Sequence, residues 1–248
     1  MTVIVTGAAH GLGRELALAC AARSDAVLGV DRDGDARADR VGVTPLAVDL
    51  RAGGAADRIV EHVNDPVTAV FHSAGISGAG RFEDIDAGHH EHSVRLTFEV
   101  PVQLTRALLA AGVCAGDARH VFIGSLSTFT GYPGAVSYAA SKDAIASFAR
   151  SLDAALDDEM SAHCAFPGPL RTDHAARYAP DNSPRTVARR QDPADAAAAI
   201  LADVERGRRR IYPSAGARAF AVAGRVAPGL TNRVMRRSVY DRLTTPRV

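Results

Sequence analysis

The sequence predicts an α/β fold, a doubly wound parallel seven-stranded sheet with helices on both faces in a single domain. Short apolar or β-branched runs alternate with longer helical patterns, which is the order of repeated strand–helix units. A glycine-rich turn joins the first of these runs to the first helical pattern, as in sheets that bind nucleotides. The 248 residues, 47% of them hydrophobic, are enough for one large domain with a full core.

Each expected strand is short and mostly β-branched or apolar, as buried parallel strands are. The strands are expected at residues 3–6, 26–30, 45–48, 67–72, 120–124, 162–166 and 210–212. Helices are expected between them at residues 14–22, 55–63, 91–111, 137–156 and 194–206. Residues 31–49 have little room for a full helix, so we expect that crossover to be shortened.

Residues 213–248 are expected to be a helical extension of the domain that residues 1–212 form. Two helical patterns, at 217–226 and 230–243, are separated by Pro228 and Gly229, and arginines are spread among their apolar residues. We expect the extension to pack against a second subunit or over the substrate mouth. A helix lying on a membrane surface is the alternative.

Composition and charge argue against several classes of protein. The net charge of +1 gives no support to nucleic-acid binding, and no apolar run approaches the roughly 18 residues that a membrane span needs. Strand-like residues directly after Met1 leave no room for a signal peptide. The three cysteines are far apart in apolar surroundings, as in a reduced protein. We expect a cytoplasmic homodimer or homotetramer without a nucleic-acid partner, and membrane binding is not favoured.

A glycine-rich turn follows the first expected strand and opens the first expected helix. Its glycines let the backbone bend tightly and approach a pyrophosphate, and the helix start supplies amide donors and a positive dipole end. The residues expected to hold a dinucleotide here are Gly7, His10, Gly11, Leu12 and Gly13.

Asp31 ends the second expected strand, eighteen residues after Gly13. A carboxylate at this place can bind both hydroxyls of an adenosine ribose, and it repels a 2′-phosphate. The alternative is that Asp31 is an ordinary turn residue. Arg32 follows and could accept a 2′-phosphate, so NADP stays open as the less favoured cofactor. We expect NAD.

Lys142 is the only lysine beside 28 arginines, and it lies four residues after Tyr138. At this spacing on a helix the two side chains share one face. A lysine ammonium is a compact charge whose pKa can shift, whereas arginine does not deprotonate. Because a fixed cation favours phenolate, we interpret the pair as an acid/base device. A surface tyrosine beside an ordinary lysine is the alternative.

With the glycine turn, Asp31 and the Tyr138–Lys142 pair in place, residues 2–212 resemble the short-chain dehydrogenase/reductase family, whose sheet is a Rossmann fold. In that family a serine lies thirteen residues before the tyrosine, which is Ser125 here. The resemblance implies that Ser125 orients the substrate oxygen and that Tyr138 transfers a proton to or from it. It also implies that Lys142 binds the nicotinamide ribose and lowers the pKa of Tyr138.

Further segments fall where that family binds its cofactor. The resemblance implies that Asp49 and Leu50 contact adenine, and that Thr172, in a Pro-Gly loop, binds the carboxamide. The remaining residues assigned to the cofactor on this basis are Ser73, Ala74, Gly75, Pro167, Gly168 and Leu170.

Two positions depart from the family pattern. His72 and Ser73 stand where the family usually has two asparagines, so the end of this strand is expected to be held differently. Thr97 falls at the family's catalytic asparagine, which helps to hold a water in the proton relay, and Arg95 is the next candidate. Threonine has a shorter reach, so either a repositioned water completes the relay or turnover is slow.

The main expectation is an oxidoreductase that uses NAD to interconvert a secondary alcohol and a ketone. A dinucleotide-binding sensor or scaffold without efficient turnover is the alternative, and Thr97 is its best support. A dehalogenase or epimerase is less favoured, because it would alter the serine–tyrosine–lysine set or the glycine turn. Aromatic residues that suggest an apolar substrate pocket are Phe129, Tyr132, Phe166 and Tyr178.

Residues 173–191 fall where the family has its substrate lid. Their arginines could meet an acidic substrate, although a solvated loop is the preferred interpretation. His89, His90 and His92 suggest a metal site, but only His89 and His92 share a helix face, and no further ligand completes it. We therefore expect a solvated helix start and no metal.

Overall fold

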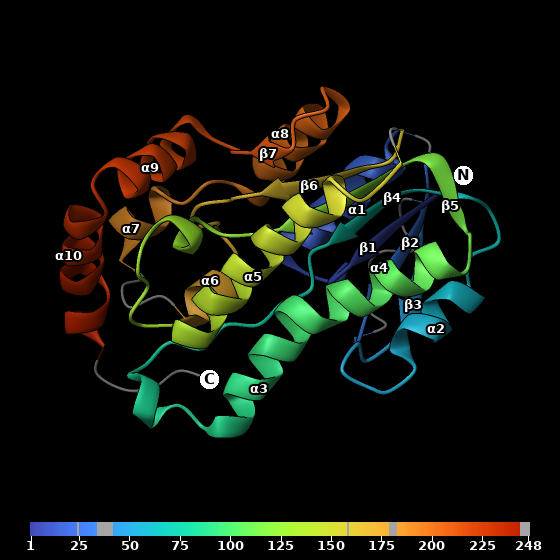
Figure 1. The fold of residues 1–248 in the computed structure, drawn as a ribbon. Helices are drawn as coiled ribbons and strands as arrows, with labels where there is room; N and C mark the ends of the chain where they lie inside the picture. The colour runs from blue at the N-terminus through green and yellow to red at the C-terminus, as the bar shows by residue number, and fades with distance from the viewer. Residues whose placement is uncertain (24, 34–41, 158, 179–182, 244–248) are drawn as a thin grey trace.

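In the described part of the chain, seven parallel strands form one sheet in the order β3-β2-β1-β4-β5-β6-β7 (Figure 1). The computed structural model describes residues 1–23, 25–33, 42–157, 159–178 and 183–243. The order reverses between β1 and β4, so the predicted doubly wound α/β fold is confirmed. The strands are β1 (Thr2–Thr6), β2 (Ala26–Asp31), β3 (Val43–Ala47), β4 (Val67–His72), β5 (Cys114–Ile123), β6 (Ser161–Ala165) and β7 (Arg210–Ile211).

Helices cover both faces of the sheet (Figure 1). α1 (Gly11–Ala21) and α8 (Pro193–Glu205) pack together over one face, and α2 (Ala55–Glu61), α4 (Val100–Ala110) and α5 (Val136–Asp153) cover the other. The remaining helices are α3 (Ala87–Val94), α6 (Asp173–Tyr178), α7 (Pro184–Ala188), α9 (Ala215–Val226) and α10 (Pro228–Ser238), with short 3₁₀ turns at η2 (Phe82–Asp84), η4 (Leu126–Phe129) and η5 (Tyr240–Arg242).

The helix expected at residues 91–111 contains a π-helical segment, η3 (Arg95–Glu99), between α3 and α4. The Val100 N–H donates to the carbonyl of Arg95, five residues earlier. Pro101 has no N–H to give to the carbonyl of Thr97, so the regular α-helical ladder cannot run through this point. Single π turns of this kind are frequent at functional sites.

The C-terminal extension docks on the loop that follows β5. Asn232 of α10 accepts hydrogen bonds from the Thr130 hydroxyl at 3.0 Å and the Gly131 N–H at 2.7 Å. The extension therefore lies beside the carboxyl ends of the strands, with α9 and α10 at the edge of the molecule (Figure 1). Among the described helices, none is both long and apolar enough to cross a bilayer.

Candidate active site

A cavity of about 1180 Å³ opens at the ends of β1, β2, β4, β5 and β6. Parallel sheets bind ligands at this edge because the turns that follow the strands converge there. The cavity brings together every residue that the sequence assigned to the cofactor or to catalysis except Thr97: Gly7, His10, Gly11, Leu12, Gly13, Asp31, Arg32, Asp49, Leu50, Ser73, Ala74, Gly75, Ser125, Tyr138, Lys142, Pro167, Gly168, Leu170 and Thr172.

The turn after β1 requires glycine at two positions. Gly7 has a φ of +72°, and a Cβ built there would lie 3.0 Å from the backbone of Ala74. A Cβ on Gly13 would lie 2.2 Å from the carbonyl oxygen of Gly7, so α1 packs directly on the turn. In the described chain no side chain caps the first amides of α1. These donors and the positive end of the helix dipole fit a pyrophosphate.

Asp31 holds its carboxylate beside the glycine turn. One oxygen accepts the Ala9 N–H at 3.0 Å and the other accepts the Asp33 N–H at 3.2 Å. Arg32 turns to Asp33 and pairs with it at 3.3 Å. Among the described residues, the end of β2 therefore presents two carboxylates to the cavity, and Arg32 is paired with one of them.

The strand end at β4 is held by a hydroxyl. Thr6 accepts hydrogen bonds from the N–H groups of Ser73 at 3.1 Å and Ala74 at 3.2 Å. The Thr6 hydroxyl therefore joins the end of β1 to the turn after β4.

At the end of β3, Asp49 is bound by Arg51 through two side-chain contacts, at 3.0 and 2.8 Å. These hydrogen bonds lower the pKa of Asp49 to about 2. The expected adenine contact of Asp49 would therefore compete with an internal ion pair.

Ser125, Tyr138 and Lys142 meet at the inner end of the cavity. Ser125 follows β5 and caps η4, where its hydroxyl accepts the Ser127 N–H at 3.2 Å. Tyr138 and Lys142 lie one turn apart on α5, and the lysine Nζ is 5.4 Å from the centre of the tyrosine ring. The predicted helical spacing thus places both side chains in the same cavity.

Burial dominates the protonation of the two groups. It raises the pKa of Tyr138 to about 12, and a hydrogen bond with Ser125 opposes this. It also lowers the pKa of Lys142 to about 8. Burial therefore acts against the lowering of the Tyr138 pKa that the family resemblance implies.

Thr97 lies behind the cavity wall, in the π-helical segment. Its side chain is 1% exposed, and its hydroxyl has no hydrogen-bond partner among the described residues. A Cβ built on Gly75 would lie 3.4 Å from the Thr97 hydroxyl and 3.8 Å from the Lys142 Nζ. The side chains of Thr97 and Lys142 therefore both lie close to Gly75.

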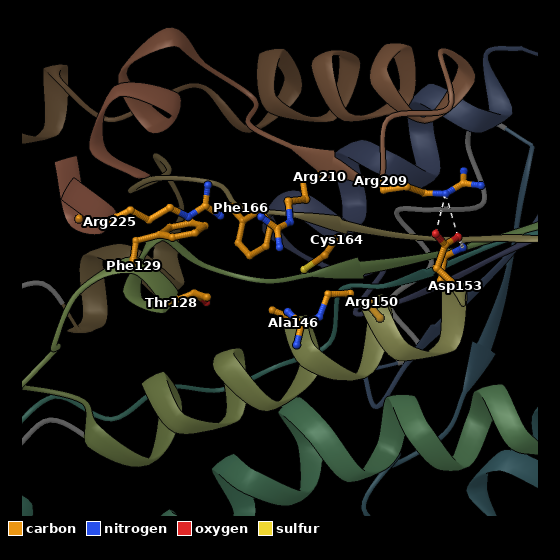
Figure 2. Close-up of a pocket in the computed structure, with 13 residues that line it drawn as sticks. Thr128, Phe129, Ala146, Arg150, Asp153, Cys164, Phe166, Arg209, Arg210 and Arg225 are labelled. Atoms are coloured by element: carbon orange, nitrogen blue, oxygen red, sulfur yellow. Dashed lines mark hydrogen bonds and ion pairs between the residues drawn. The ribbon is translucent and has the colours of Figure 1, made fainter. Parts of the chain in front are cut away.

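The expected aromatic substrate wall is split between two cavities. Tyr132 lines the large cavity, whereas Phe129 and Phe166 line a second one on the α5 side of the sheet (Figure 2). The side chain of Tyr178 lies outside the described residues, as do residues 179–182 of the expected lid. Phe129 and Phe166 pack in the hydrophobic cluster on the α5 side of the sheet.

Several cavity residues carry no motif that could have identified them. The C-terminal extension contributes apolar side chains to the cavity. Ser127 is buried, and its hydroxyl has no hydrogen-bond partner in the described residues. The main additions are Leu126, Ser127, Phe220, Met235 and Val239.

Two of the three histidines of α3 have hydrogen-bond partners. His89 contacts the carbonyl of Ser77 at 3.1 Å, and His90 contacts the carbonyl of Phe82 at 3.1 Å and the hydroxyl of Ser137 at 2.7 Å. These contacts join His89 and His90 to the segment before α3 and to α5, while Ala87, Glu91 and His92 are exposed, as the expected solvated helix start requires.

Comparison with known proteins bears on the whole arrangement. The sequence profile described as short chain dehydrogenase matches residues 1–183. The oxidoreductase YbbO of Escherichia coli is 29% identical over 178 residues, which are 69% of this chain and 66% of YbbO, just under two thirds of its length. A short-chain dehydrogenase structure from Streptomyces avermitilis is 26% identical, with a TM-score of 0.77 over 90% of each chain.

Two further solved structures contain a dinucleotide. One, from Sphingobium yanoikuyae in complex with NADPH, is 24% identical, with a TM-score of 0.77 over 90% of this chain and 92% of that one. The other, from Burkholderia phymatum in complex with NAD, is 20% identical, with a TM-score of 0.75 over 89% and 91%. At these identities the likeness shows the fold alone.

Proposed function

The chain belongs to the short-chain dehydrogenase family of oxidoreductases, and on this premise we propose that it transfers a hydride between NAD(H) and a secondary alcohol or ketone. One observation carries the proposal. Ser125, Tyr138 and Lys142 converge at the inner end of a single cavity whose other end holds the glycine turn and Asp31. A dinucleotide extended between these ends would bring its nicotinamide to the three side chains.

The adenosine end of the cavity favours NAD. Asp31 is fixed by two backbone donors in a position suited to the ribose hydroxyls. A 2′-phosphate would meet Asp31 and Asp33, and Arg32 is paired with Asp33 at 3.3 Å. The two carboxylates would repel the phosphate because the charges are alike, although solved structures of this fold contain either NADPH or NAD.

When bound, the nicotinamide supplies or takes up the hydride. The protein's part is to position the substrate oxygen and move its proton. Ser125 would hydrogen-bond that oxygen, and the Tyr138 hydroxyl would give it a proton during ketone reduction. Because burial raises the pKa of Tyr138 to about 12, the tyrosine keeps its proton at neutral pH, which suits reduction. Oxidation would require Lys142 and the cofactor charge to lower that pKa.

The substrate region is largely apolar. Leu126, Met235 and Val239 line it from two separate parts of the chain, with Tyr132 beside them. Such a wall binds the hydrocarbon body of an alcohol or ketone through burial of apolar surface. Arg190 and Arg242 line the same cavity, so an acidic group on the substrate could also be bound there.

A sensor or scaffold is the second candidate, and Thr97 favours it. The Thr97 hydroxyl is buried near Lys142 and, in the described residues, meets no partner that would extend a relay.

Purified protein should be assayed with NAD and NADP against a panel of secondary alcohols and ketones, with Tyr138→Phe as the negative control. NAD-dependent turnover that Tyr138→Phe abolishes would support the enzyme. Tight dinucleotide binding without turnover of any compound would support the scaffold.

A further inference from the structure

A second cavity, of about 360 Å³, lies on the α5 side of the sheet, between α5, β6 and α9 (Figure 2). Its floor is apolar and buried, and it is formed by small and aromatic side chains. Arginines reach it from α5, from the start of β7 and from α9, as Figure 2 shows. The floor residues are Phe129, Ala149, Ala162, Cys164 and Phe166.

The charge of this cavity is unbalanced. Of its four arginines, Arg209 is paired with Asp153 at 2.8 Å. In the described residues, Arg150, Arg210 and Arg225 contact no carboxylate, and Arg150 donates only to the Ser147 hydroxyl, at 3.1 Å. Scattered surface arginines are commonly just solvated. Arg150, Arg210 and Arg225 are exposed, but they reach one apolar cavity from three separate elements, so an anion bound in it would be attracted by all three charges.

Arg225 is held in place for such a contact. Its guanidinium lies 4.7 Å from the centre of the Phe129 ring and reaches the Tyr212 hydroxyl at 3.5 Å. The neighbouring Gly224 allows this approach, because a Cβ there would lie 2.1 Å from the carbonyl oxygen of Phe129. A guanidinium stacked on a ring keeps its edge donors free for a planar acceptor such as a carboxylate.

We propose that this cavity binds an organic anion, a carboxylate attached to an apolar body. The carboxylate would lie between Arg210 and Arg225, and the apolar body would cover the floor. The cavity shares a wall with the candidate active site, since a Cβ on Gly124, next to Ser125, would lie 3.0 Å from the Cys164 sulfur on the cavity floor. The ligand would thus sit behind the catalytic side chains without entering the cofactor cavity.

Calorimetric titration of the full chain, saturated with NADH to occupy the large cavity, would test the proposal. Octanoate is the probe, and 1-octanol and octylammonium are the neutral and cationic controls. We expect octanoate to bind best. Arg210→Gln should weaken it about tenfold, the effect of losing one charge-assisted hydrogen bond. The matched variant Arg58→Gln changes an exposed arginine of α2 away from the cavity and should leave the affinity unchanged.

A variant that changes the shape of the cavity but no charge distinguishes binding inside the cavity from a general effect of surface charge. Ala146→Leu narrows the cavity from the α5 side and should weaken octanoate binding at an unchanged melting temperature. Octanoate binding that is absent, or that resists both Arg210→Gln and Ala146→Leu, would overturn the proposal. So would sedimentation showing a dimer that dissociates in Arg210→Gln, because a second copy would then fill the cavity.

Discussion

The Lys142 Nζ donates a hydrogen bond of 2.6 Å to the carbonyl oxygen of Ile123, the last residue of β5. This bond ties α5 to the strand that ends just before Ser125. Lys142 is 5% exposed, and burial lowers its pKa to about 8. The backbone therefore fixes the cation beside Tyr138, and the same burial makes its proton easier to release near neutral pH.

The first prediction concerns cofactor choice. If Asp31 binds the ribose hydroxyls, NADH should bind at least about tenfold more tightly than NADPH, or about 1.4 kcal/mol. Asp31→Ala should shrink that difference, since it removes the charge that repels a 2′-phosphate. Fluorescence titration of both cofactors measures it. Equal affinity of the unaltered protein for the two would contradict the assignment.

Tyr138→Phe tests the proton transfer. It removes one hydroxyl, so kcat should fall at least about 100-fold, the usual scale for a positioned acid or base, while the NADH affinity stays unchanged. Tyr240→Phe is the matched control, because Tyr240 lies outside the cavity lining and contacts Arg81. Activity of Tyr138→Phe within a few-fold of the parent would remove Tyr138 from the mechanism.

Lys142→Arg keeps the charge but changes its shape. A guanidinium is bulkier and does not release a proton, so it cannot replace an ammonium held 2.6 Å from a carbonyl oxygen. Activity should collapse, and the basic limb of the pH–rate profile should move upward, because a displaced cation lowers the pKa of Tyr138 less. Near-parental kinetics with an unmoved profile would mean that only the charge matters. Arg58→Lys is the control, because it exchanges the same two residue types at an exposed position of α2 outside the cavity.

Burial of Lys142 also predicts how stability depends on pH. Its pKa falls from 10.5 to about 8 on folding, so between these values the unfolded chain binds more protons than the native protein. The free energy of unfolding should therefore rise by about 2 kcal/mol from pH 7.5 to 9.5 on account of this group. Urea unfolding at both pH values, compared with Lys142→Met, isolates the effect. The same rise in Lys142→Met would assign it to other groups.

Gly13→Ala tests the packing of the glycine turn. The new Cβ would lie 2.2 Å from the Gly7 carbonyl oxygen, so α1 must shift. Overpacking of this kind costs about 1–3 kcal/mol, and NADH binding should weaken because the helix start moves. Gly53→Ala is the control, since a Cβ there meets nothing within 4 Å. Thermal melting that shows both variants equally stable would contradict the close packing.

Local patterns predicted much of the fold and site, since β4 has the expected bounds and the residues of the motifs share one cavity. The start of β5 was not predictable. It begins at Cys114 instead of residue 120, although Gly116 and Asp117 are poor strand formers. Its pairing with β4 shifts register between Val67 and Ala69, and this tertiary contact outweighs local preference.

Protonation at the site was also beyond prediction from the sequence. The spacing of Tyr138 and Lys142 predicted their proximity, but the depth at which both are buried depends on loops and on the C-terminal extension. The roles of Met235 and Val239 depend on the docking of α10 through Asn232, a contact between residues about a hundred positions apart. No local pattern encodes such a contact.

The burial of the one lysine has a consequence for chemical labelling. Acylating reagents such as succinimidyl esters attack unprotonated amines, and the 248 residues offer them a single side-chain target. That target is 5% exposed, inside the cavity proposed to hold the cofactor, while every other basic side chain of the Lys/Arg class is an inert guanidinium. Modification of a side-chain amine thus becomes a direct report on access to Lys142, and NADH should protect it.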